Sequence, residues 1–289
     1  MTADAALTEG LLASYRRAIA ATTAVAADIR DAARAVGDRW QAGGRCVYLG
    51  AGSSGLAAAE DAAELPGTFG MEASRIVIIL AGGVARPFEI DAAIEDDFEA
   101  GRREIAALGD LSADAVIAVS ASGSTPFTLG GAEAARQGGA LLIGLANRAG
   151  SPLLRLADMP IWLDSGEEAL QGSTRLAAGV AQKCALGLLS TLLGLQLGHI
   201  HRGLMVNLQA DNEKLRRRAI GIIATLAQGD EATAHDALDA ARGDVKSAIL
   251  IAAGASGPEA ATALLAASRG RIDDALAQLI EARHARAQN

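Results

Sequence analysis

The chain has 289 residues, enough for one or two domains with a sizeable core, and its formal net charge is −8. This acidic balance argues against non-specific nucleic-acid binding, which depends on neutralising phosphates with lysine and arginine. Hydrophobic residues make up 51% of the sequence, and its many alanines and glycines favour a helix-rich α/β protein. The two cysteines and four histidines are not accompanied by a cluster of acids, so we expect reduced thiols and no metal ion.

Helices and strands are predicted to alternate over the first part of the chain. Apolar residues at a 3.6-residue spacing predict a helix over residues 5–42. The strands predicted after it are Arg45–Leu49, Arg75–Leu80, Ala115–Val119, Ala140–Leu145 and Met159–Leu163. The helices predicted between them are Ser54–Glu64, Phe88–Leu108 and Thr125–Gln137. This alternation indicates a parallel sheet with helices on both faces.

The chain is predicted to be helical again after Gly172. Long helices are expected at Ser173–Leu197 and Leu208–Ala227, and Gly229-Asp230 marks a break. Three or four short helices are expected to follow, with candidates at residues 231–241, 244–253, 258–267 and 272–285. We therefore expect a main domain over residues 1–228 and a small helical domain over 229–289.

The sequence predicts no membrane segment. The uncharged run over residues 184–198 is shorter than the roughly 20 residues that a membrane-spanning helix needs, which favours a buried helix. The N-terminus lacks the basic region and apolar core of a signal peptide. A cytoplasmic location is therefore expected.

Two short glycine- and serine-rich segments are the most informative feature of the sequence. Residues 50–55 (GAGSSG, the first turn) and 120–126 (SASGSTP, the second turn) each follow a predicted strand and precede a predicted helix. Such turns direct backbone N–H groups and hydroxyls to one spot, where a helix N-terminus adds positive potential. Because both lie at carboxyl ends of strands in one sheet, they predict a shared phosphate site. The candidate ligand-binding residues are Gly52, Ser53, Ser54, Ser120, Ser122, Gly123, Ser124 and Thr125.

Two other interpretations of the first turn have to be weighed. Its sequence fits the G-x-G-x-x-G pattern of dinucleotide sites, but that pattern requires an acid at the end of the second strand. Here the second strand runs into Ala81-Gly82-Gly83, so a sugar phosphate is favoured over a dinucleotide. A purely structural tight turn is the remaining alternative.

Two glutamates, Glu64 and Glu95, are candidates for acid–base chemistry. Glu64 lies near the end of the helix after the first turn, and Glu95 lies in an acidic segment with Asp96 and Asp97. A carboxyl group beside a bound sugar can move protons if its surroundings shift its pKa towards neutrality. Their positions in the sequence alone would fit solvent-exposed acids without a catalytic role equally well.

The order of these motifs resembles the N-acetylmuramic acid 6-phosphate etherases, which belong to the sugar isomerase (SIS) domain superfamily. The resemblance covers about residues 40–218, and the helical tail is similar to that family's small C-terminal domain. The matching segments are residues 44–55, 61–70, 81–83, 95–97, 121–126, 172–176, 181–183, 204–206 and 212–215.

The resemblance implies a SIS-type five-stranded parallel sheet and a cofactor-independent lyase of peptidoglycan recycling. The substrate would be an amino-sugar 6-phosphate whose D-lactyl ether is cleaved, and the enzyme would act as a homodimer. Glu64, as the proton donor, and Glu95 would form the catalytic pair. Ser173, Glu168 and Lys183 would contribute to the site, although a helix cap or a surface ion pair would also account for them.

The chain departs from the family pattern directly after the first turn and within the second. The family typically has an arginine at the positions of Leu56 and Ser124, where a guanidinium could bind a carboxylate or phosphate. Two alternatives to the etherase therefore stay open. One is another SIS isomerase or lyase for a phosphosugar, and the other is a non-catalytic regulator that senses a phosphosugar.

Overall fold

The structure is a computed structural model that describes residues 2–84, 92–210 and 212–287. The chain forms two compact units. The first contains Met1–Ala63 and Ala73–Leu193, and the second contains Glu64–Glu72 and Gly194–Asn289. The domain boundary expected at residue 229 stays a prediction.

The first unit is built on a five-stranded parallel sheet with the strand order β2-β1-β3-β4-β5. Its strands are β1 (Cys46–Gly50), β2 (Ile76–Leu80), β3 (Ala115–Val119), β4 (Leu141–Ala146) and β5 (Met159–Trp162). Each begins and ends within one residue of its predicted bounds. Strands β1 and β3 are buried along their whole length, as their near-continuous apolar sequences predict for a sheet covered on both faces. The expected α/β fold is confirmed.

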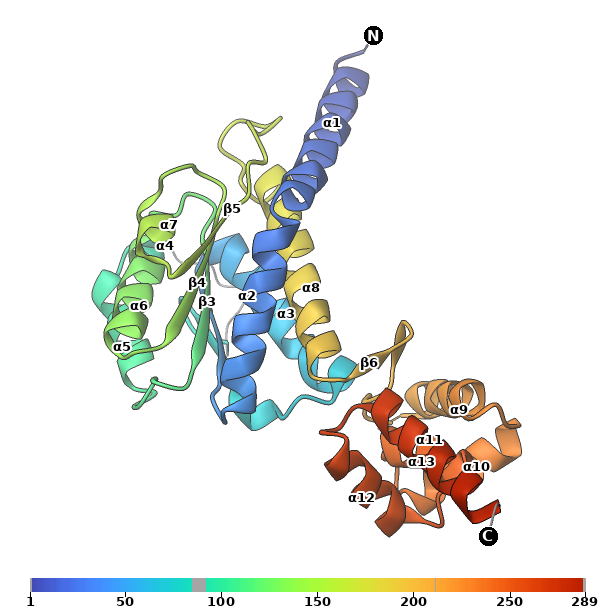
Figure 1. Ribbon diagram of the computed structural model, residues 1–289. Helices are drawn as coiled ribbons and strands as arrows, with labels where there is room; N and C mark the ends of the chain where they lie inside the picture. The colour runs from blue at the N-terminus through green and yellow to red at the C-terminus, as the bar shows by residue number, and fades with distance from the viewer. Residues whose placement is uncertain (1, 85–91, 211, 288–289) are drawn as a thin grey trace. The chain divides into compact units, whose positions relative to one another are not determined.

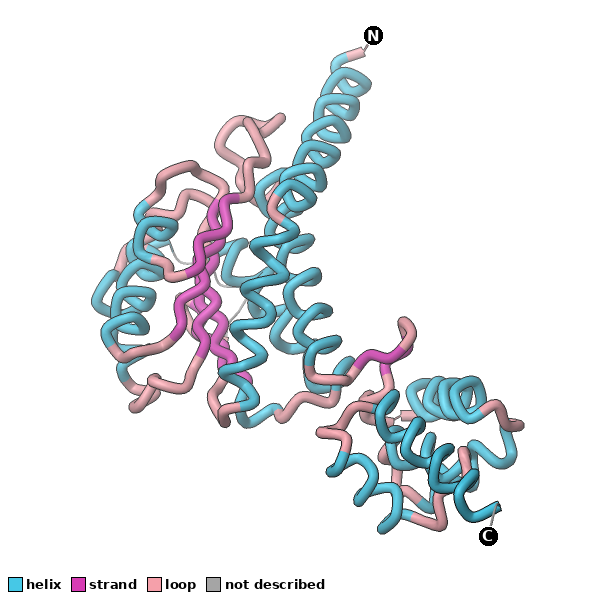
Figure 2. The backbone as a smooth tube through the Cα atoms, viewed as in Figure 1, coloured by secondary structure: helices cyan, strands magenta, loops and turns pink. Residues whose placement is uncertain are grey.

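Helices cover both faces of this sheet (Figures 1 and 2). Figure 1 shows α5, α6 and α7 on one face, and α2, α3 and α8 on the other. The helices that include residues of this unit are α1 (Ala3–Ala24), α2 (Ala26–Gln41), α3 (Gly52–Phe69), α4 (Ala92–Glu95), α5 (Phe98–Ala106), α6 (Pro126–Gln137), α7 (Pro152–Leu156) and α8 (Ala177–Gln196). Within the part of the chain that the structure describes, α8 alone has the length and composition of a membrane span, and half of its most apolar stretch is buried.

The helix predicted over residues 5–42 is observed as two helices, α1 and α2, because the helical conformation is interrupted at Val25. The hydroxyl of Thr22 donates to the carbonyl of Ala18 at 3.3 Å, and that of Thr23 donates to the carbonyl of Ile19 at 3.1 Å. Such bonds, together with β-branched side chains, weaken a helix locally. Val25 leaves the helical conformation with φ −108° and ψ 18°.

The helix predicted over residues 88–108 falls partly outside the described residues. In its described part, α4 ends at Glu95 and a separate helix, α5, begins at Phe98. The break occurs because Asp97 caps α5, its carboxylate accepting the N–H of Ala100 at 2.8 Å. Glu95 therefore stands at the end of a short helix.

Among its described residues, the second unit contains the ends of α3 and α8, a short antiparallel hairpin and five further helices. The hairpin pairs β6 (Ile200–His201) with β7 (Leu204–Met205). The helices are α9 (Glu213–Ala227), α10 (Glu231–Ala240), α11 (Val245–Ala252), α12 (Pro258–Ala267) and α13 (Ile272–Ala287). They share a core in which Ile223, Leu238 and Ile249 are fully buried. All four candidate helices predicted after residue 229 are thus confirmed.

Lys246 is a buried polar residue of this second unit, and His199 is a half-buried one. The ammonium group of Lys246 donates to the carbonyl of Gly270 at 2.9 Å, and burial lowers the pKa of Lys246 to about 8. Burial, reinforced by the charge of Lys246, lowers the pKa of His199 to about 4, although a hydrogen bond with the backbone of Phe69 opposes the shift. His199 is therefore neutral at pH 7.

Candidate active site

The first turn is a sharp change of direction between β1 and α3. Strand β1 ends at Gly50, and α3 begins at Gly52, whose φ of +52° lies in the left-handed region. A Cβ at Gly50 would lie 2.7 Å from the Cα of Gly55, so the backbone segments at these two residues can approach this closely only if residue 50 has no side chain. The turn thereby points the first N–H groups of α3 past the carboxyl end of the strand.

The second turn carries a network of hydroxyl groups. The hydroxyl oxygens of Ser120 and Thr125 lie 2.9 Å apart, and Ser120 also accepts the N–H of Gly123 at 3.1 Å. The hydroxyl of Ser122 accepts both the N–H of Ser124, at 3.2 Å, and its hydroxyl, at 3.1 Å. Helix α6 follows at Pro126 without a side-chain cap, so its first N–H groups are available to an anion.

The two turns lie next to each other because the strands that precede them, β1 and β3, are neighbours in the sheet. Gly50 and Val119 pair at the ends of β1 and β3, and the hydroxyl of Ser54 accepts the N–H of Ala121 at 3.3 Å. Ser53 is exposed next to this contact. The first unit thus brings the hydroxyls and amides of both turns to one edge of the sheet, which is the arrangement that the sequence predicted for a phosphate site.

Glu95 lies against the first turn. A Cβ at Gly52 would lie only 2.6 Å from Oε1 of Glu95, which places the carboxylate beside the N-terminus of α3. Partial burial, and to a smaller extent the charge of Asp96, raises the pKa of Glu95. A carboxyl group in this place, with a pKa above its usual value, is suited to exchange a proton with a bound ligand.

Glu64 lies twelve residues after Gly52 on helix α3, and its side chain is exposed. It belongs to the second unit, whereas Glu95 belongs to the first. The expectation that the two glutamates act on one substrate therefore stays a prediction.

One turn before Glu64, helix α3 is anchored to the first unit by Asp61. This carboxylate is 4% exposed and accepts hydrogen bonds from the hydroxyls of Tyr48 and Ser190, both at 3.0 Å. Burial, together with Cys46 and Asp61, raises the pKa of Tyr48 well above its usual value, so the phenol stays a donor. The bonds of Asp61 join β1, α3 and α8, and they fix the helix that follows the first turn.

Three further predicted site residues cluster around helix α8. The carboxylate of Glu168 accepts the N–H groups of Ala177 and Ala178, both at 2.9 Å, and so caps this helix. Lys183 forms an ion pair with Glu60 at 3.2 Å. Ser173 is half-buried in the segment that precedes the helix. Glu168 and Lys183 thus have protein partners, and ligand contacts of all three stay predictions.

Sequence reasoning missed a pair of amide side chains at the same edge of the sheet, one half-buried and one buried. Asn147, which directly follows β4, accepts the side-chain N–H of Gln182 at 3.0 Å and donates to the carbonyl of Leu163 at 3.0 Å. Gln182 is 1% exposed. A polar residue at the end of an apolar strand, as in Leu-Ala-Asn, was the signal available for Asn147.

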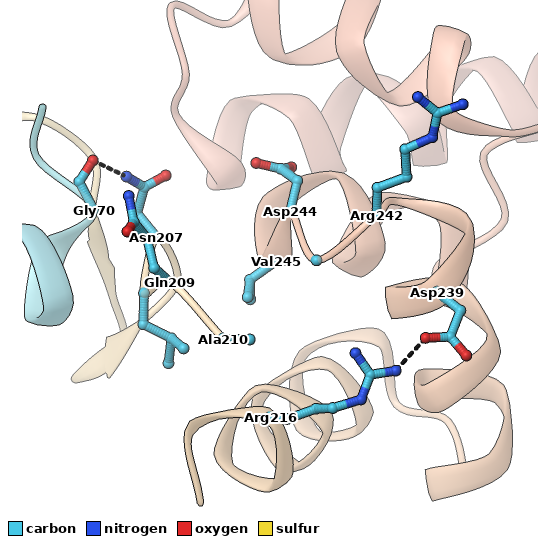
Figure 3. A pocket seen from close by; sticks show the side chains of 11 residues that line it. Gly70, Asn207, Gln209, Ala210, Arg216, Asp239, Arg242, Asp244 and Val245 are labelled. Carbon is cyan, nitrogen blue, oxygen red and sulfur yellow. Dashed lines mark hydrogen bonds and ion pairs between the residues drawn. The ribbon is translucent and has the colours of Figure 1, made fainter. Parts of the chain in front are cut away.

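The second unit has a polar pocket of about 460 Å³ (Figure 3), which the sequence did not predict. Figure 3 shows Arg216 reaching to Asp239 in an ion pair on one side of the pocket. On the other side, the side chain of Asn207 donates to the carbonyl of Gly70 at 3.4 Å and to that of Phe69 at 2.9 Å. These contacts stabilise the unit itself and leave the pocket without an assigned ligand.

Comparison with known proteins relates the first unit to SIS domains. A family model described as SIS domain matches residues 12–147, and a second model with the same description matches residues 111–190. Among solved structures, a phosphoheptose isomerase from Francisella tularensis is similar, with a TM-score of 0.50 and 19% identity. The similarity covers 68% of this chain and 100% of that one, and at this identity it concerns the fold.

Curated relatives are similar over most of the chain. The N-acetylmuramic acid 6-phosphate etherase of Deinococcus radiodurans is 42% identical over 234 residues, which cover 81% of this chain and 77% of that protein. The protein of the same name from Streptomyces avermitilis is 43% identical over 259 residues, covering 89% of this chain and 83% of that protein. The similarity therefore extends beyond the sheet and its two turns.

Proposed function

Because the chain belongs to the N-acetylmuramic acid 6-phosphate etherase family, we propose that it cleaves the D-lactyl ether of N-acetylmuramic acid 6-phosphate. Water is consumed, and the products are N-acetylglucosamine 6-phosphate and D-lactate. The observation that carries this proposal in the molecule is the carboxylate of Glu95 beside the first turn, at the edge of the sheet where both turns meet.

The two turns hold the phosphate group in this proposal. The N-terminal N–H groups of α3 and α6 and the hydroxyls of Ser54, Ser120 and Ser122 supply donors for its oxygens. Phosphate binding fixes the sugar, so that its reacting carbons lie at a constant distance from the turns. Binding energy from a group that does not react is thereby used to orient the group that does.

The chemistry requires a base and an acid. Opening of the sugar ring turns C1 into an aldehyde, which makes the proton on C2 acidic. We assign its removal to the Glu95 carboxylate, because a raised pKa makes a carboxylate a stronger base. Glu64 is the proton donor in this proposal and protonates the ether oxygen as the C–O bond breaks and lactate leaves. Water then adds across the double bond, its oxygen going to the carbon that lost lactate and a proton returning to C2.

The test is release of D-lactate from N-acetylmuramic acid 6-phosphate by the wild-type chain and by the variants Glu95→Gln and Glu64→Gln. General acid–base groups contribute about 10²- to 10⁴-fold, so each variant should lose activity by that order while still binding N-acetylglucosamine 6-phosphate. Glu104→Gln is a matched control, because this glutamate is exposed on the neighbouring helix α5. Wild-type rates in both glutamine variants would refute the assignment.

Solvent exchange separates the etherase from the two alternatives. Deuterium from solvent at C2 of a bound phosphosugar, without lactate release, would indicate another SIS isomerase or lyase. Tight phosphosugar binding with neither exchange nor turnover would indicate a regulator.

We further propose that the chain acts as a cytoplasmic homodimer in peptidoglycan recycling. Exposed apolar side chains on helix α1, namely Leu7, Leu12 and Ile19, support an association of two copies. Light scattering that gives the molar mass of a single chain at micromolar concentration would contradict the dimer.

A further inference from the structure

The two turns offer a phosphate many hydrogen-bond donors but no positively charged side chain. Residues 50–56 and 120–127 contain no lysine or arginine. A phosphate monoester carries a charge of about −1.5 to −2 at pH 7, since its second pKa is about 6. Glu95 adds a further carboxylate beside the first turn. Helix N-termini contribute only about half a positive charge each, so a cationic side chain nearby would balance the remaining charge of the ligand.

Arg148 is the cation whose backbone is tied to the second turn. It lies on the loop over residues 147–151, between β4 and α7. Backbone hydrogen bonds from the first residue of this loop and from helix α7, which follows it, hold the chain to the turn on both sides of Arg148. The N–H of Asn147 donates to the carbonyl of Ala121, and the N–H of Leu153 donates to the carbonyl of Gly123, both at 3.0 Å. The loop also packs closely on the turn, because a Cβ at Gly123 would lie 2.2 Å from the hydroxyl of Ser151.

The guanidinium of Arg148 is not engaged within the described residues. Its side chain is exposed, and it forms no ion pair or side-chain hydrogen bond with any residue in the described ranges. Several other cations of the first unit do have partners: Lys183 pairs with Glu60, Arg17 donates to the carbonyl of Glu167 at 3.1 Å, and Arg155 donates to the carbonyl of Gly150. Arg148 thus combines nearness to the second turn with an available charge.

We propose that Arg148 binds the phosphate group of the substrate and selects phosphorylated over unphosphorylated sugars. A guanidinium presents a planar fork of N–H donors that fits two phosphate oxygens at once. It also carries a full positive charge, which the hydroxyls and amides of the turns do not. The proposal rests on the proposed function, from which it takes the phosphosugar. Arg148 contacts the non-reacting end of the substrate, so it contributes to binding more than to the rate of the chemical step.

The rival cation is Arg175. It is exposed in the segment before α8, also without an ion pair among the residues that the structure describes, but no hydrogen bond ties this segment to the second turn. Arg148→Gln and Arg175→Gln therefore form a pair of variants that remove the same charge from two loops. Arg148→Lys keeps the positive charge but removes the planar guanidinium that can bind two phosphate oxygens at once.

The experiment measures the dissociation constant of N-acetylglucosamine 6-phosphate by calorimetry, and kcat and KM for D-lactate release. Arg148→Gln should weaken phosphosugar binding and raise KM by about 10- to 100-fold, with kcat changed less than about threefold. Arg148→Lys should recover part of the affinity, and Arg175→Gln should leave it near wild type. Because Arg148 is exposed, the thermal unfolding midpoint should not change.

The outcomes separate this proposal from the proposed function. Wild-type affinity in Arg148→Gln, or a loss found only in Arg175→Gln, overturns the role of Arg148 even if lactate is released. A wild-type chain that releases no lactate but binds N-acetylglucosamine 6-phosphate through Arg148 supports the phosphate site and refutes the etherase. Equal loss of binding for phosphorylated and unphosphorylated N-acetylglucosamine also overturns the proposal, because it would indicate a general change of the loop.

Discussion

Substitution of Gly52 by alanine probes the contact between the first turn and Glu95. Gly52 has a φ of +52°, a conformation that costs a residue with a Cβ about 1–2 kcal/mol. The new methyl group would also lie 2.6 Å from Oε1 of Glu95 and 3.3 Å from its Cδ. The backbone strain should lower the free energy of unfolding, and the close contact should displace the carboxylate of Glu95.

Each effect has an expected size. The strain should lower the free energy of unfolding by about 1–2 kcal/mol. Restoring an ordinary carbon–oxygen contact requires the carboxylate to move by on the order of 0.5–1 Å, because contacts below 3.0 Å are not tolerated. A displacement of 1 Å can cost about 10²-fold in rate, so kcat for D-lactate release should fall by about 10- to 100-fold.

Urea denaturation and the D-lactate assay measure the two effects separately. Gly187→Ala is the matched control, because Gly187 lies inside helix α8 with nothing within 4 Å of an added Cβ. That variant should gain about 0.5–1 kcal/mol of stability and keep its kcat. If Gly52→Ala shows both the stability and the kcat of the wild type, neither the left-handed turn nor the proximity of Glu95 is correct.

Two further predictions concern buried titratable groups. Because the pKa of His199 is lowered to about 4 from about 6.5, the unfolded chain binds more protons than the folded chain between these values. The free energy of unfolding of the second unit should therefore rise with pH across this window and fall by about 2 kcal/mol from pH 7 to pH 5. Urea denaturation at both pH values checks this, and an equally large fall in His199→Gln would assign it to other groups. Burial above all raises the pKa of the Cys46 thiol to about 12, so iodoacetamide at pH 8 should modify Cys46 only in denaturant. Mass spectrometry of the peptides checks this, and rapid modification of the native chain would contradict the burial.

The sheet could be predicted from the sequence because its strands are short apolar runs that need both faces covered. Ala115–Val119 is predicted and observed with identical bounds. The helix boundaries were less accurate where a side chain redirects the backbone. The break at Val25 follows two threonines whose hydroxyls bond to the preceding helical turn, and α8 begins at Ala177, where its N–H is capped by Glu168 from nine residues earlier in the sequence.

The site could be predicted only as far as local sequence determines it. Glycines between an apolar strand and an alanine-rich helix indicated both turns, because the left-handed backbone at Gly52 and Gly123 is encoded locally. The contact of Glu95 with Gly52 joins residues 43 positions apart, and the bond between Asn147 and Gln182 joins residues 35 apart. Such pairs depend on how helices pack on the sheet, which no local pattern specifies.

The hydroxyl network of the second turn has a consequence for ligand binding. Ser120 and Ser122 each bond to groups within the turn, so the backbone there keeps its shape by its own hydrogen bonds. A hydroxyl can rotate its proton towards an incoming phosphate oxygen while its heavy atoms stay in place. The turn is therefore preorganised, and binding exchanges one set of hydrogen bonds for another at little cost in conformational entropy.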